Sequence, residues 1–102
     1  MPKYKVVGVS ESKGEYKGYE YRNLILHTEC EDRYTVGVKT DKFKIKWVNL
    51  SDVFRLGLRD SEINNLTTSD FKDLLGKNVS FYFDRYGNPD SVEVIEEKAK
   101  TQ

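Results

Sequence analysis

The sequence predicts a mostly β protein, a compact barrel of five or six strands with a short helix before a C-terminal hairpin. A chain of 102 residues has room for one domain around one core. Its 37% apolar and 13% aromatic residues are typical of globular chains. Apolar and polar residues alternate in several segments, and this period of two indicates strands. We expect one barrel domain over residues 1–97 and a polar tail over residues 98–102.

Two strands open the chain. Residues 4–11 are largely apolar and β-branched, and Gly8 within them marks a bulge or a close backbone approach. Residues 12–18 carry two glycines among charged residues, which is typical of a surface turn. Residues 19–30 are rich in Tyr, Ile and Leu and lack a helical stripe, so they predict one long strand.

The next segments also alternate. Residues 31–33 turn the chain, and residues 34–38 predict a third strand. Residues 42–48 predict either a fourth strand or the continuation of a strongly bent third.

Short helices are expected in the middle of the chain. Residues 51–58 predict a helix that Ser51 caps and Gly57 stops, and residues 59–65 predict a polar loop. Residues 67–77 predict a second helix of about two turns, with an apolar stripe along it. Its cap is Thr68 or Ser69, and its stop is Gly76.

Residues 78–97 have the pattern of a hairpin whose turn contains Gly87, Asn88 and Pro89. One face of this hairpin is expected to carry Val79, Phe81, Phe83, Val92 and Val94. A helix inserted before the last pair of strands matches the oligonucleotide/oligosaccharide-binding (OB) barrel, whose helix lies between its third and fourth strands.

The charge is balanced but unevenly distributed. The chain has 17 basic and 17 acidic residues, so binding to a polyanion would need local clustering. Residues 1–50 hold ten basic and seven acidic residues, and the second half reverses these numbers. The lone Cys30 excludes an internal disulfide, and no segment approaches the roughly 20 apolar residues of a membrane span. We expect a cytoplasmic protein.

No pattern for catalysis or metal binding is found in the sequence. His27 and Cys30 form a single His-x-x-Cys without a second pair, and in a strand they would point to opposite sides. The glycines form no phosphate-binding loop, and the single His leaves no nucleophile signature. We expect a protein that is not an enzyme and that uses no metal or cofactor.

Aromatic and basic side chains near the predicted strands suit single-stranded nucleic acid, which is bound by stacking on rings and by contacts to phosphates. Tyr19 and Tyr21 share a strand face that points away from the apolar Leu24 and Leu26. The candidate binding residues are Tyr19, Tyr21, Lys42, Lys44, Lys46, Tyr82, Arg85 and Tyr86.

The lysine row has two interpretations. Lys42, Lys44 and Lys46 alternate with Phe43, Ile45 and Trp47, so the lysines are first the solvated face of a strand whose other face is core. They can in addition contact phosphates. Trp47 can likewise stack on a base, but its place in an apolar row favours the core.

The ending "LLGKNVSFYFDRYGNPDSVEVI" resembles small single-stranded-DNA-binding proteins of phages, plasmids and conjugative elements. A Gly-Lys entering an aromatic strand, followed by Asp-Arg-Tyr-Gly and a return strand, carries the resemblance, and "YEYRNLILHTE" resembles them more loosely. The resemblance implies an OB barrel, protection of single strands, and positions for Tyr82, Arg85 and Tyr86 near the nucleic acid.

The sequence therefore predicts a binding protein for single-stranded DNA, with RNA as another option. The alternative is a protein-interaction module, an adaptor or inhibitor, that uses the same barrel and needs no basic face. The oligomeric state stays open, with a homodimer among the options.

Overall fold

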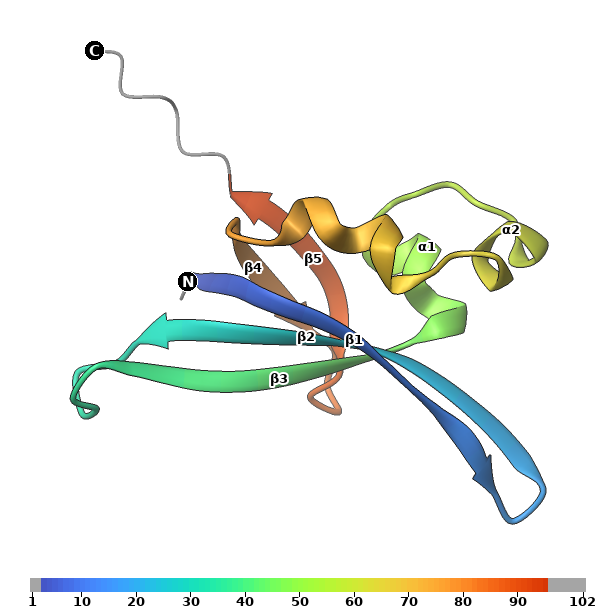
Figure 1. Ribbon diagram of the computed structural model, residues 1–102, viewed down its shortest axis with the longest axis horizontal. Helices are drawn as coiled ribbons and strands as arrows, with labels where there is room; N and C mark the ends of the chain where they lie inside the picture. Colours follow the sequence, from blue (N-terminus) through green and yellow to red (C-terminus); the bar gives the residue numbers. More distant parts are fainter. Residues whose placement is uncertain (1–2, 96–102) are drawn as a thin grey trace.

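The computed structural model describes residues 3–95, which form one five-stranded antiparallel sheet and four short helical segments (Figure 1). The strand order is β3-β2-β1-β4-β5. The predicted mostly β class is confirmed. Among the described residues β3 and β5 lie near each other but are not hydrogen-bonded, so the sheet is open between them. The strands are β1 (Tyr4–Tyr16), β2 (Tyr19–Glu31), β3 (Val38–Lys46), β4 (Asn78–Phe83) and β5 (Pro89–Ile95).

The first hairpin is longer than the sequence predicts. β1 pairs with β2 from Lys5 to Tyr16, with a register shift between Val6 and Gly8 that confirms the predicted bulge. The prediction of a turn over residues 12–18 is wrong, because only Lys17 and Gly18 lie between the strands, both with positive φ. Beyond the pairing of β3 and β4 the hairpin continues as a two-stranded arm (Figure 1).

The predicted third strand over residues 34–38 is wrong for residues 34–37, and only Val38 belongs to a strand, as the first residue of β3. Thr35 donates hydrogen bonds from its N–H and its hydroxyl to Asp32, and Gly37 has a φ of 96°, so residues 34–37 lie in the turn between β2 and β3. Alternation alone misled here, because Val36 is fully exposed and has nothing to pack against. One strand, β3, follows without a break at residues 39–41.

The helical region between β3 and β4 differs from the prediction in its boundaries. It contains η1 (Trp47–Asn49), α1 (Leu50–Val53), α2 (Asp60–Asn64) and η2 (Thr68–Leu74), where η denotes a 3-10 helix. Among residues 3–95 no helix is long and apolar enough to cross a lipid bilayer.

Side-chain and turn contacts explain these boundaries. The helix expected at 51–58 ends early because Arg55, not Gly57, takes the first positive φ, and the Leu56 N–H bonds back to the Ser51 carbonyl. Ser51 is not the cap, because its hydroxyl accepts from the Leu58 N–H.

The second half of the helical region is fixed by two carboxylates. The loop expected at 59–65 contains α2, which begins where Glu62 accepts from the Arg59 N–H. The helix expected at 67–77 is a 3-10 helix that starts after Thr67, whose N–H donates to Asp70. Gly76 has the predicted positive φ.

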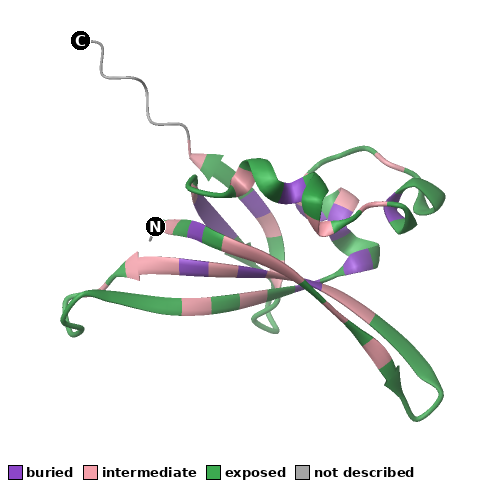
Figure 2. Ribbon diagram, in the orientation of Figure 1, coloured by how far each residue is buried: buried purple, intermediate pink, exposed green. Residues whose placement is uncertain are grey.

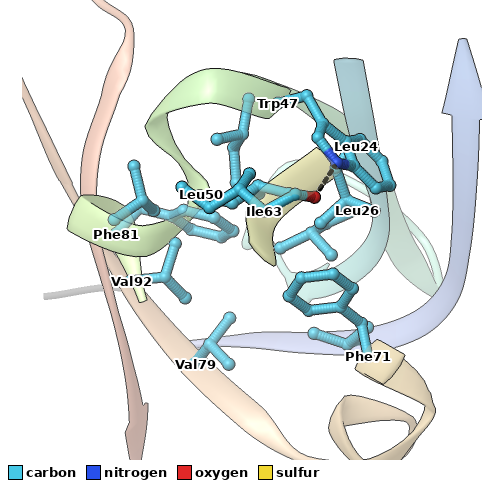
Figure 3. Packing of buried hydrophobic residues seen from close by; sticks show 12 residues of the cluster. Leu24, Leu26, Trp47, Leu50, Ile63, Phe71, Val79, Phe81 and Val92 are labelled. Carbon is cyan, nitrogen blue, oxygen red and sulfur yellow. Dashed lines mark hydrogen bonds between the residues drawn. The ribbon is translucent and has the colours of Figure 1, made fainter. Parts of the chain in front are cut away.

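The core lies between the inner face of the sheet and the helical region (Figure 3). Ile45 and Trp47 are buried as predicted, although Trp47 opens η1 and does not continue the strand. The Trp47 indole N–H donates to the Ile63 carbonyl at 2.8 Å, which ties α2 to the end of β3. The buried apolar residues are Val6, Leu24, Leu26, Ile45, Trp47, Leu50, Val53, Ile63, Phe71, Val79, Phe81 and Val92.

The closing hairpin forms as predicted for its inner residues. Val79 pairs with Val94, and Phe81 pairs with Val92. Phe83 lies on the same side, next to Phe43 and Phe81, but about half of it is exposed. The predicted polar tail at 98–102 and the last two hairpin residues, 96 and 97, lie outside the described residues.

Candidate nucleic-acid interface

The outer face of the β1–β2–β3 meander carries five of the eight candidate residues. Residues opposite each other in an antiparallel pair point to the same face. Lys42, Lys44 and Lys46 pair with His27, Ile25 and Asn23 in turn. Two and four residues before Asn23 on β2, that face continues with Tyr21 and Tyr19. The lysine row and this tyrosine pair therefore share one side of the sheet.

The lysines point to water because the alternate residues of β3 fill the core. Ile45 is buried and Phe43 is partly buried, whereas all three lysines are exposed. β3 is also an edge strand of the sheet. Lysines on an edge strand hinder pairing with other chains, so the row has a structural use that does not depend on a ligand.

Small residues on β1 leave Tyr21 room on the outer face. The outward positions of β1 opposite β2 are occupied by Gly8, Ser10, Ser12 and Gly14. A Cβ on Gly14 would lie 2.6 Å from the Tyr21 hydroxyl oxygen, so the ring occupies space that only glycine leaves free. Tyr21 is 45% exposed and thus offers part of its surface to a ligand. This explains a glycine that the sequence assigned to a turn.

Tyr19 lies at the tip of the arm. It pairs with Tyr16 next to the turn at Lys17 and Gly18, and it is 79% exposed. The rings of Tyr16 and Tyr19 are available to a ligand. Unlike Tyr21, they do not line the larger groove described below.

The other three candidates lie on the β4–β5 hairpin. Tyr82 is exposed and its hydroxyl lies 3.4 Å from a Glu93 carboxylate oxygen. Asp84 accepts the N–H groups of Tyr86 and Asn88, which fixes the turn. Tyr86 is 76% exposed, with the Arg85 guanidinium 5.4 Å from its ring centre. The turn therefore presents a ring and a cation together.

The β4–β5 turn comes close to the lysine row. A groove of about 290 Å³ is lined by Lys44 and Lys46 on one side and by Asp84 and Asp90 on the other. Of the candidate residues only Lys44 and Lys46 line this groove, whereas Tyr82, Arg85 and Tyr86 do not. The carboxylates weaken the local positive potential, because opposite charges nearby offset each other.

A larger open groove, of about 1050 Å³, lies where the arm leaves the sheet. Tyr21, Lys44 and Lys46 line it with residues that sequence reasoning missed, namely Lys13, Asn23, Val48 and Asn64. Val48 follows the buried Trp47, and alternation alone would have marked it as exposed. Nothing in the sequence indicates Asn64, because only the folding of α2 onto the arm brings it to the groove.

Arg22 lines this groove but is used by the fold. Its guanidinium bonds to Glu11 at 2.6 Å and donates to the carbonyls of Asn64 and Leu66 at 3.0 and 3.1 Å. It also lies 3.7 Å from the centre of the Trp47 ring. Among residues 3–95 the one ion pair is that of Arg22 with Glu11.

His27 and Cys30 do not build a metal site in the described part of the chain. His27 is hydrogen-bonded to Ser10 at 2.8 Å across the sheet. Within residues 3–95 no three His, Cys, Asp or Glu side chains are grouped to hold an ion.

Neither a protein-family model, nor a curated protein, nor a solved structure matches this chain. The chemistry of the outer face therefore has to be argued from its own residues.

Proposed function

We propose that this protein binds single-stranded nucleic acid, in the first place DNA, and that it does so without catalysing a reaction. One observation carries the proposal: exposed tyrosines and a row of three lysines lie on the same face of the sheet. Tyrosine rings offer stacking surfaces to bases, and lysines offer contacts to phosphates. The ligand needs both at once.

The strand arrangement supports an OB-type barrel for this role. β1, β2 and β3 form a meander, the helical region precedes β4, and β4 pairs with β1. β5 then lies near β3 at the open side of the sheet. OB barrels are partly open and bind oligonucleotides on strands 2 and 3 and on the loops after strands 1 and 4. Seven of the eight candidate residues lie on β2, on β3 or in the turn after β4, and Tyr82 lies on β4 itself.

The geometry of the row sets a quantitative expectation. Alternate residues of a strand are about 6.8 Å apart, so the three lysines can contact separate phosphates of an extended strand. Each phosphate contact with a single strand adds about 0.7 to the log–log salt dependence of binding. Three contacts therefore predict a slope of at least about 2.

The test is fluorescence anisotropy with a labelled single strand of about 16 nucleotides, the upper site size of one OB fold, and the matching duplex over a range of salt. We expect micromolar or tighter binding to the single strand at low salt, a slope of at least about 2, and weaker binding to the duplex, whose bases are already stacked. Equal binding to both, or a slope near zero, would contradict the proposal.

The acidic residues next to the row favour one other function. Asp84 and Asp90 give Lys44 and Lys46 a mixed-charge surrounding, which suits a protein partner as well as a polyanion. If this protein is an adaptor or inhibitor that binds a protein partner with this face, that binding would depend on salt much less steeply than nucleic-acid binding does. The salt series therefore separates the two functions.

A further inference from the structure

We propose that the groove at the base of the arm, lined by Tyr21, Asn23, Val48 and Asn64, binds one nucleobase of the strand and prefers adenine. This inference rests on the proposed function and adds a subsite and a base preference to it. The groove joins three parts of the chain: the arm of β1 and β2, the end of β3, and the helices η1 and α2. In Figure 1 the end of β3 and the start of the helical region lie where the arm leaves the sheet, and the bond from Arg22 to the Asn64 carbonyl brings α2 to the arm.

The walls of the groove are held in place before any ligand arrives. Arg22 on the arm bonds to the carbonyls of Asn64 and Leu66 in the helical region and to Glu11 on the neighbouring strand. The Trp47 indole N–H bonds to the Ile63 carbonyl in α2. These contacts fix α2 relative to β2. A fixed site loses little conformational entropy when it binds.

The lining suits a planar group that carries an anion. Tyr21 provides an aromatic surface that rests over Gly14, and Val48 provides an apolar side chain that is 69% exposed. Lys44 and Lys46 form the border on the β3 side. Apart from Arg22, whose charge is offset by Glu11, three lysines and two glutamates line the groove, and this small basic surplus favours a negative ligand. A nucleotide combines the planar base with the phosphate.

Two side-chain amides can read the edge of that base. The main-chain carbonyl of Asn64 is engaged by Arg22, which fixes the residue at the groove. Asn23 lines the groove opposite Lys46 in the sheet. The carboxamide of Asn pairs with N6 and N7 of adenine, and unstacked bases of a single strand expose this edge. A purine also gives the ring of Tyr21 a large stacking partner.

The test compares homopolymers of deoxyadenosine, thymidine and deoxycytidine, each of about 12 nucleotides, within the site size of one OB fold. The first variant is the pair Asn23→Ala and Asn64→Ala, with the exposed neighbour Asn65→Ala as its control. The second is Tyr21→Ala, with Tyr34→Ala as control, because Tyr34 is 86% exposed at the opposite end of the meander.

We expect wild type to bind the adenosine polymer best. The variant that combines Asn23→Ala and Asn64→Ala should weaken that binding by roughly 5- to 150-fold, corresponding to the loss of one carboxamide–adenine contact. Its affinity for the other polymers should stay within about twofold of wild type. Tyr21→Ala should weaken all three polymers by a similar factor. Gly14→Ala should also weaken all three, because a Cβ displaces the ring without removing it. Both control variants should bind like wild type.

The outcomes separate this inference from the proposed function. Wild-type binding without any base preference, or an equal loss for all three polymers in the Asn pair, would overturn the adenine subsite and leave strand binding intact. Binding that Tyr21→Ala does not change would overturn the groove itself. No binding of any polymer by wild type would overturn both.

Intrinsic fluorescence provides a second measurement. Trp47 is the only tryptophan and lines this groove. A base that enters should change its emission, and the change should be larger with the adenosine polymer and smaller in the Asn pair. If anisotropy shows that the adenosine polymer binds but Trp47 emission does not change, the base binds outside this groove.

Discussion

The two faces of the β2–β3 pair differ although alternating residues of the same two strands build them. Leu24, Leu26 and Ile45 on the inner face are almost completely buried. On the outer face Ile25 and His27 are partly exposed, and the lysines of β3 are exposed (Figure 2). Because the inner face alone supplies the core, the outer face is available for binding. The comparison predicts that substitutions on the two faces have separate effects.

The largest effect on stability is expected when Leu24, on the inner face of β2, is compared with its outer-face neighbour Ile25. Leu24→Ala should lower the free energy of unfolding by about 3 kcal/mol, because it removes a fully buried side chain. Ile25→Ala, one position along, should cost only about 1 kcal/mol, because Ile25 is partly exposed. Urea unfolding of both variants measures the difference. Equal losses would break the distinction between the faces.

Arg22 tests how firmly the arm is attached to the core. Arg22→Ala should cost about 2 kcal/mol, because it breaks an ion pair, two hydrogen bonds and a contact with the Trp47 ring. Arg22→Lys should recover little, since an ammonium cannot reproduce the planar, forked geometry of these contacts. Full recovery by Lys would show that charge alone matters. Thermal unfolding of the two variants provides the measurement.

The edge position of the lysine row can be tested separately from binding. Changing Lys42, Lys44 and Lys46 together to Val should make the protein self-associate, because it leaves an apolar edge strand with no charge to prevent pairing. Light scattering against concentration measures this. A monodisperse valine variant would show that the lysines do not protect the edge.

The smallest effect is expected from a polar group on the inner face. Tyr4 packs edge-on against the stacked rings of Phe43 and Phe81, and burial, with smaller effects from Cys30 and Asp41, raises the pKa of its hydroxyl above the usual value. The folded state then holds this proton longer than the unfolded state, so stability falls as pH rises above about 10. Tyr4→Phe should lose less stability than wild type over that range in urea unfolding. Identical pH dependence would contradict the assignment.

Features fixed by backbone geometry were predictable from sequence. The period of two in a strand is fixed, so alternation placed Leu24 and Ile45 inside and the lysines outside. Alternation cannot show whether a segment has a partner strand, and Tyr34 to Gly37 were misassigned for that reason. Composition likewise cannot separate a glycine in a turn from Gly14, which makes room for a ring across the sheet.

The candidate site was predictable in part. Tyr21 and the lysines were chosen for their chemistry, and the register then placed them on one face. Asn64 and Arg22 could not be assigned from sequence. The groove residue Asn64 depends on where α2 packs, and the structural role of Arg22 depends on carbonyls more than forty residues away. Such contacts leave no local pattern in the chain.

The most direct test of the account combines binding and stability in one variant. Lys42, Lys44 and Lys46 are changed together to Gln, which removes their charge without placing a like charge beside Asp84 and Asp90. The control changes Lys39, Lys72 and Lys77, which are exposed outside both grooves, in the same way. We expect an unfolding free energy within about 0.5 kcal/mol of wild type for both variants.

For the outer-face variant we also expect weaker single-strand binding and a salt slope lower by about 2, because three phosphate contacts are lost. The control variant should keep the wild-type slope. An outer-face variant that unfolds more easily, or that binds as the control does, would contradict the claim that the two faces have separate roles.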